Sequence, residues 1–168
     1  MLTNKKSNIA MKHLSRLALG LWGCLFLAAC ESQDCTLYNV VGMYSNFYRN
    51  GSAVQLNDTL TITACGSDSI LLNRKVGANF LTLPLSYWQK EDTLVFSLKG
   101  DGFLVRDTIW ISKTDKTHFE SPDCPVAIFH DITHVHSSHQ FIDTVLVTRP
   151  AVNYDKTENL QIYISAAD

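Results

Sequence analysis

Histidine is the residue type whose spacing suggests chemistry in this sequence. Five of the six histidines lie close together: His118, His130, His134, His136 and His139. On a strand, side chains two residues apart share a face, so His130, His134 and His136 are expected to line up. Two such imidazoles, with His139 or His118 as a third, could bind zinc or copper. A metal site of His134, His136 and His139 is therefore one hypothesis, and solvent-exposed histidines without a ligand are the simpler one.

Other catalytic patterns are missing from the sequence. It has no Gly-x-Ser-x-Gly elbow and no glycine-rich phosphate loop, and no cysteine has a basic residue beside it. A Ser-His-Asp triad is recognised by geometry, which composition does not supply. We therefore expect a protein that is not an enzyme and has no resident cofactor.

The N-terminal segment has the parts of a bacterial lipoprotein signal. Four basic residues precede an uncharged, mostly apolar run of 13 residues, 17–29, which is shorter than the roughly 20 residues that a membrane-spanning helix needs. The run closes on Leu27-Ala28-Ala29-Cys30, which looks like a lipobox, where the cysteine thiol receives diacylglycerol. We expect cleavage after Ala29 and a lipid anchor on Cys30. The alternatives are a secreted protein with an ordinary thiol at Cys30, and a start at Met11.

The predicted cleavage and lipidation sites divide the chain into three parts: a signal peptide (1–29), a lipidated tether (30–35) and a single domain (36–168). Cleavage removes four of the 14 basic residues and none of the 16 acidic ones, which leaves a formal charge of −6. An acidic domain lacks the basic face that nucleic acid requires. The expected partners are the membrane, through the lipid, and an envelope protein. The expected location is the outer membrane, on a face that the residues after Cys30 do not specify.

Three cysteines lie beyond the lipidation site, an odd number for an oxidising compartment. Cys35 and Cys124 lie in polar, turn-rich surroundings, whereas Cys65 ends an apparent strand. We favour a Cys35–Cys124 disulfide with Cys65 as a half-buried free thiol. A bridge that contains Cys65 is the alternative.

The elements that must position these residues are strands. Short alternating runs are separated by turn residues, and Arg49-Asn50-Gly51-Ser52 is a good hairpin signal. Pro84 indicates an edge strand, because proline cannot donate to a ladder. Trp88 and Trp110 are expected in the core or on a sheet face. Eight or nine strands are expected in an all-β, two-sheet antiparallel sandwich, immunoglobulin-like or transthyretin-like, and the clearest runs are 39–48, 58–64, 69–76, 79–85, 126–136 and 159–164.

An aspartate–threonine pair introduces several of these runs. We interpret the aspartate as closing the preceding turn with its side chain, while threonine begins the strand. Calcium binding is the alternative, but the aspartates are too dispersed for a calcium loop. The four copies are Asp58-Thr59, Asp92-Thr93, Asp107-Thr108 and Asp143-Thr144.

Several stretches together resemble a family of small Bacteroidota lipoproteins of unknown function. They are Asp34-Cys35-Thr36-Leu37, Leu56-Asn57-Asp58-Thr59-Leu60, Ser69-Ile70-Leu71-Leu72-Asn73, Leu83-Pro84-Leu85-Ser86, His118-Phe119-Glu120-Ser121-Pro122-Asp123-Cys124-Pro125, Ile128-Phe129-His130-Asp131-Ile132-Thr133 and Val152-Asn153-Tyr154-Asp155. The resemblance implies an envelope lipoprotein and also favours the pairing of Cys35 with Cys124. It implies no activity or ligand. Cys65 and the group His134, His136 and His139 do not belong to its pattern.

We therefore expect a cell-envelope lipoprotein that serves as a non-enzymatic binding or structural accessory module. A metal-binding envelope protein that uses the histidine cluster is the alternative.

Overall fold

The computed structural model describes residues 41–67, 69–122 and 124–165. The predicted signal peptide, Cys30, the tether and Cys35 lie outside these residues. These described residues form one compact unit. The described part contains no helix that could cross a membrane.

The strands of the described part are β1 (Gly42–Arg49), β2 (Ser52–Val54), β3 (Thr59–Ala64), β4 (Ser69–Lys75), β5 (Phe80–Pro84), β6 (Glu91–Lys99), β7 (Leu104–His118), β8 (Ala127–Ser137), β9 (Ile142–Val147), β10 (Ala151–Val152) and β11 (Leu160–Ile164).

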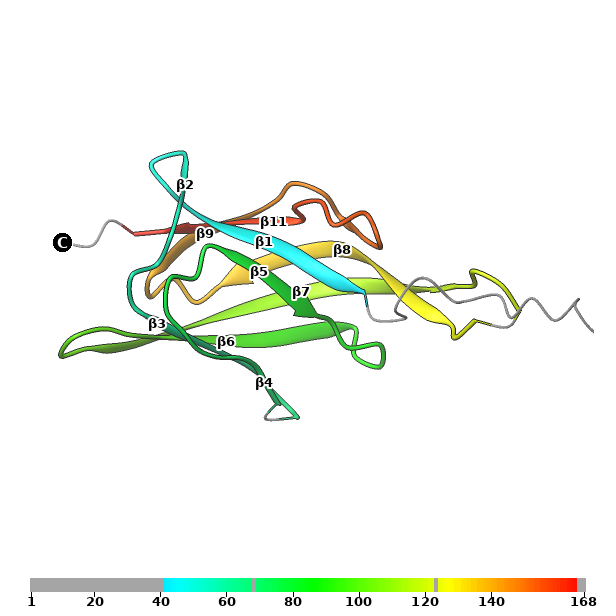
Figure 1. Cartoon of the computed structure of the whole chain (residues 1–168), viewed down its shortest axis with the longest axis horizontal. Helices are drawn as coiled ribbons and strands as arrows, with labels where there is room; N and C mark the ends of the chain where they lie inside the picture. Colours follow the sequence, from blue (N-terminus) through cyan, green and yellow to red (C-terminus); the bar gives the residue numbers. More distant parts are fainter. Residues whose placement is uncertain (1–40, 68, 123, 166–168) are drawn as a thin grey trace, which may run out of the picture. The chain divides into compact units, whose positions relative to one another are not determined.

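The strands form two sheets that face each other (Figure 1). One sheet has the order β2-β1-β11-β9, with β5 also paired to β1, and the other has the order β10-β8-β7-β6-β3-β4. The predicted all-β sandwich is confirmed. Its pairs are antiparallel except for β1 and β11, which run parallel although they come from the two ends of the described chain. Local alternation could not predict that long-range pair.

Two local predictions are confirmed. Asn50 and Gly51 have φ values of 51° and 78°, and Arg49 pairs with Ser52 across them. Positive φ at both central residues is the geometry of the two-residue turn that suits the twist of a hairpin. Strand β5 pairs with β1 and with no other described strand, so Pro84 lies on an edge as expected.

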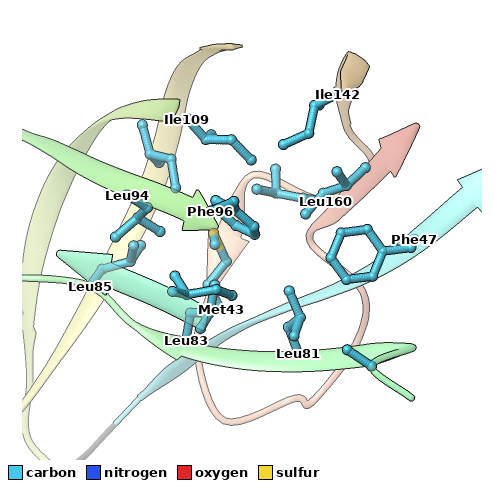
Figure 2. Close-up of a cluster of buried hydrophobic side chains, with 14 of the residues drawn as sticks. Met43, Phe47, Leu81, Leu83, Leu85, Leu94, Phe96, Ile109, Ile142 and Leu160 are labelled. Atoms are coloured by element: carbon cyan, nitrogen blue, oxygen red, sulfur yellow. The ribbon is translucent and has the colours of Figure 1, made fainter. Parts of the chain in front are cut away.

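The core lies between the two sheets, because alternate residues of each strand point inward. Strand β1 supplies Met43 and Phe47, and the opposite sheet supplies Leu94, Phe96 and Ile109. All five are at most 1% exposed. Figure 2 shows these side chains packed against one another, with residues of β5, β9 and β11 completing the cluster. The unit therefore has an apolar core of its own.

Candidate functional site

A β-bulge in β8 divides the predicted histidine cluster. The register between β7 and β8 shifts at Thr133, which stands opposite no residue of β7. An extra residue reverses the alternation of the strand that contains it. His130 is 3% exposed and faces the interior, whereas His134 and His136 are exposed. The prediction that these three side chains share a face is wrong.

The exposed histidines of the described residues are not gathered into a three-ligand group. His136 stacks on Trp110 with ring centroids 4.7 Å apart, so the prediction of a sheet-face position for Trp110 is confirmed. His139 contacts the carbonyl of Asp143 through Nδ1 at 2.8 Å. Within residues 41–67, 69–122 and 124–165, no group of three or more His, Cys, Asp or Glu side chains could hold a metal ion. The set of His134, His136 and His139 is therefore not assembled, and His118 instead stacks on Phe129.

His130 instead lines an apolar pocket of about 450 Å³. Its lining residues come from the start of β1, from the end of β5 and the loop after it, and from the start of β8, and these elements can be followed in Figure 1. Carbon-rich side chains form most of its wall, and Tyr87 and His130 supply the polar groups. Pockets of this kind bind small molecules through apolar contact and a few placed polar groups. Its lining residues are Val41, Pro84, Leu85, Tyr87, Val126, Ile128 and His130.

An ionic network around the buried Lys113, with Asp115 on its exposed side, supports the His130 wall of this pocket. The Lys113 side chain is 0% exposed, and its Nζ lies 2.9 Å from Oδ1 of Asp115 and 3.6 Å from Oδ2 of Asp92. The same Asp115 oxygen lies 2.7 Å from Nδ1 of His130. Burying a lysine is tolerated only when it is paired and hydrogen-bonded. Asp115 therefore joins the cation to the imidazole.

The charge of Asp115 is maintained by these two partners. Desolvation by itself raises the pKa of Asp115, but hydrogen bonds from His130 and Lys113, and the charges of both, outweigh it and lower the pKa. The carboxylate therefore stays ionised and fixes the orientation of the ring. Nδ1 of His130 is bound to Asp115, so Nε2 is the ring nitrogen that can hydrogen-bond a group in the pocket.

The loop at the pocket's rim carries two exposed aromatic side chains. Tyr87 is 65% exposed and Trp88 is 66% exposed, with ring centroids 4.4 Å apart. The expectation that Trp88 belongs to the core or to a sheet face is wrong. Trp88 follows the edge strand in a loop without strand pairing, so no partner covers it within the described part of the unit. In the sequence, the only indication of this exposed position is that two aromatic residues stand together shortly after Pro84, the proline of the edge strand.

One of the four aspartate–threonine pairs has a role that the sequence did not indicate. Asp92 does close the preceding loop, since it accepts a hydrogen bond from Ser86 N at 3.1 Å. Asp107 instead lies inside β7, is 0% exposed and binds the distant loop between β8 and β9. Its two carboxylate oxygens accept hydrogen bonds from Thr108 N, Ser138 N and Oγ, Gln140 N, Phe141 N and Ile142 N. It is a structural anchor of that loop.

The cysteines are only partly within the described residues. Cys65 follows β3, as expected, and is a free thiol, but it is exposed rather than half-buried because its side chain lies in the turn after the strand. The bridge between Cys35 and Cys124 stays a prediction, since Cys35 lies outside the described residues.

Alkylation of the folded, unreduced protein should therefore modify Cys65 alone, because an exposed thiol reacts and a disulfide does not. After reduction and unfolding, Cys35 and Cys124 should become labelled as well. Peptide mapping by mass spectrometry measures both states. A peptide that joins Cys65 to either other cysteine would overturn the pairing.

Comparison with known proteins adds a family but no activity. A model of the family of unknown function DUF6452 matches residues 59–164, which run from the start of β3 to the end of β11. No curated protein and no solved structure matches the chain. The pocket residues from Pro84 to His130 fall inside the matched range, whereas Val41 precedes it.

Proposed function

Because this chain belongs to DUF6452, a family of unknown function, we propose its role from its own residues: it is a lipid-anchored binding module of the bacterial cell envelope, without enzymatic activity. The lipobox at Cys30 and the basic, apolar segment before it support the anchor. The resemblance to small lipoproteins supports an outer membrane of the Bacteroidota type. The mature domain binds rather than transforms its ligand.

The observation that carries the binding role is the apolar pocket with His130 in its wall. A ligand with an apolar body of suitable size would remove the surfaces of Leu85, Val126 and Ile128 from water. A polar group on that ligand would hydrogen-bond Nε2 of His130. The ligand class is thus a small amphiphile with one hydrogen-bonding end.

The ionic network favours binding over catalysis. A paired aspartate and histidine also occur where a histidine activates a nucleophile, which then hydrogen-bonds the imidazole. Here Asp115 is shared with the buried Lys113, and no hydroxyl or thiol of a described residue hydrogen-bonds the His130 ring. The pair therefore acts as a fixed wall of the pocket.

Filling the pocket should abolish binding of an apolar probe. We expect wild-type protein to bind the neutral fluorophore N-phenyl-1-naphthylamine saturably, with a rise in its emission. Val126→Trp should weaken that binding at least tenfold, because the indole occupies part of the pocket. Fluorescence titration measures the effect, and thermal unfolding confirms that the variant is folded.

The matched control is Val147→Trp, since Val126 and Val147 are both 40% exposed and only Val126 lines the pocket. The control should bind the probe like the wild type. Equal binding by both variants, or no saturable binding by the wild type, would contradict the proposed function.

A further inference from the structure

The rim of the pocket has the composition of a membrane-interface surface. Tyr87 and Trp88 project from the loop between β5 and β6 and are about two-thirds exposed. Neighbouring exposed aromatics are unusual on a domain that stays free in water, and they mark interaction sites. Tyrosine and tryptophan are the residues that concentrate at the boundary between lipid tails and water, where an apolar ring and a polar group are both satisfied.

This loop is held in a fixed position. Nζ of Lys113 donates hydrogen bonds to the carbonyl oxygens of Ser86 and of Gln89, the latter at 2.8 Å. Ser86 N donates to Asp92, and Gln89 N donates to Ser86 Oγ at 3.3 Å. The two carbonyls on either side of the aromatic pair are thus tied to a buried cation. The aromatic side chains therefore need little ordering when they enter another medium.

The number of residues between Cys30 and Val41 favours this part of the unit as the one nearer the membrane. Val41 lines the pocket together with Tyr87, and Cys30 precedes it by eleven residues. Eleven extended residues reach about 40 Å at most. The turn between β6 and β7 lies farther from Val41, because β6 leads from the aromatic loop to that turn and its nine residues span about 30 Å. Figure 1 shows the start of β1 and the β5–β6 loop on the same side of the unit, away from the turn between β6 and β7, with the ends of β7 and β8 extending beyond them.

We propose that Tyr87 and Trp88 insert into the interface of the phospholipid bilayer that holds the lipid anchor, so that the apolar pocket opens at the membrane surface. This inference rests on the proposed function, since it requires the lipid on Cys30. Tethering raises the local concentration of the bilayer, so two aromatic side chains suffice for docking. The net charge of the mature chain is negative, so the surface that fits is zwitterionic rather than anionic.

Depth-dependent quenching tests this docking on the lipidated protein. The chain contains Trp22, Trp88 and Trp110, and cleavage removes Trp22, so Trp110→Phe leaves Trp88 as the sole tryptophan of the mature protein. This variant is reconstituted in phosphatidylcholine vesicles with and without a brominated phosphatidylcholine. We expect brominated lipid to quench Trp88 by at least half. Acrylamide quenching of Trp88 should fall several-fold relative to residues 31–168 free in solution.

A tryptophan in the turn between β6 and β7 is the matched control. Phe103 lies in this turn and is 48% exposed. In a Trp88→Phe, Trp110→Phe background, Phe103→Trp should report no quenching by brominated lipid. Equal quenching at positions 88 and 103 would overturn the proposed orientation.

Flotation of the same vesicles separates the two proposals. If the protein fails to float with the vesicles, the lipid anchor is wrong, and both the proposed function and the docking fall with it. If the protein floats while Trp88 stays accessible to acrylamide and insensitive to brominated lipid, only the docking is overturned.

Discussion

Replacing Asp107 with asparagine should destabilise the protein by about 3–5 kcal/mol, a large fraction of the stability of a small domain. Oδ2 of Asp107 accepts three backbone N–H groups from residues 140–142, at 2.7–2.9 Å, and Oδ1 accepts hydrogen bonds from Thr108 and Ser138. The asparagine side chain has one oxygen in place of two. Its NH₂ group would therefore face either the donors that now bind Oδ1 or those that now bind Oδ2, and would leave them without an acceptor. Each buried donor left without an acceptor costs about 1–3 kcal/mol. Urea unfolding measures the difference.

The sequence supplies the control for this variant. Asp143-Thr144 repeats the local pattern of Asp107-Thr108, but Asp143 is exposed and accepts one hydrogen bond, from Ser165 Oγ at 2.7 Å. Asp143→Asn should change stability by less than about 1 kcal/mol. Equal effects of the two substitutions would show that Asp107 does not anchor the loop.

The effect of Asp107→Asn should also depend on pH. Burial raises the pKa of Asp107, but hydrogen bonds from Ser138 and from the N–H groups of residues 140–142 outweigh it, so the folded-state pKa lies below the ordinary value. A depressed pKa gives stability that is present above the unfolded-state pKa, about 3.9, and is lost as pH falls through the folded-state pKa. The stability difference between wild type and variant should therefore be full near pH 7 and shrink below about pH 4.

Replacing Lys113 with methionine should have an effect of similar size, about 3–5 kcal/mol. Methionine keeps the length of the side chain but removes the charge and all donors. It would leave Asp92 buried beside an apolar group, and the carbonyls of Ser86 and Gln89 would lose their shared donor. Breaking a buried pair on one side costs far more than the pair contributes in net terms, because the remaining charge is uncompensated. Urea unfolding measures this change in the free energy of unfolding.

Lys116→Met on the same strand is the matched control. Lys116 pairs with Asp131, but its side chain is 69% exposed, and exposed pairs contribute at most about 1 kcal/mol. Hydrogen exchange at the amide of Ser86 gives a second readout, since the loop of residues 85–90 should open in Lys113→Met and stay protected in Lys116→Met. If the two lysine variants unfold at the same urea concentration, the buried network does not hold the loop.

Local patterns predicted most of the fold because they are decided by neighbouring residues. Alternating Leu60 and Ile62 mark β3, and both are 0% exposed. Asn50-Gly51 predicts the first hairpin, because few other residues accept positive φ at both central positions. Pro84 predicts an edge because its ring removes a donor. None of these inferences needs a distant partner.

The candidate site was predicted poorly because it depends on register and burial. One unpaired residue, Thr133, reverses the side-chain alternation of β8 and separates His130 from His134 and His136. The position of a bulge depends on the register between two paired strands, and no residue type in β8 predicts it. The metal hypothesis rested on unbroken alternation through this point.

The sequence by itself determined an all-β sandwich, its first hairpin and its edge strand, and it predicts the lipid anchor at Cys30. These follow from side-chain period, turn chemistry and composition, which are local properties. Only the tertiary structure decided which of two equivalent aspartates, Asp107 or Asp143, would be buried, and that Lys113 would point inward. The reason is that the free energy of a charged group depends on the solvent and the partners around it, and these are fixed only when strands distant in sequence pack together.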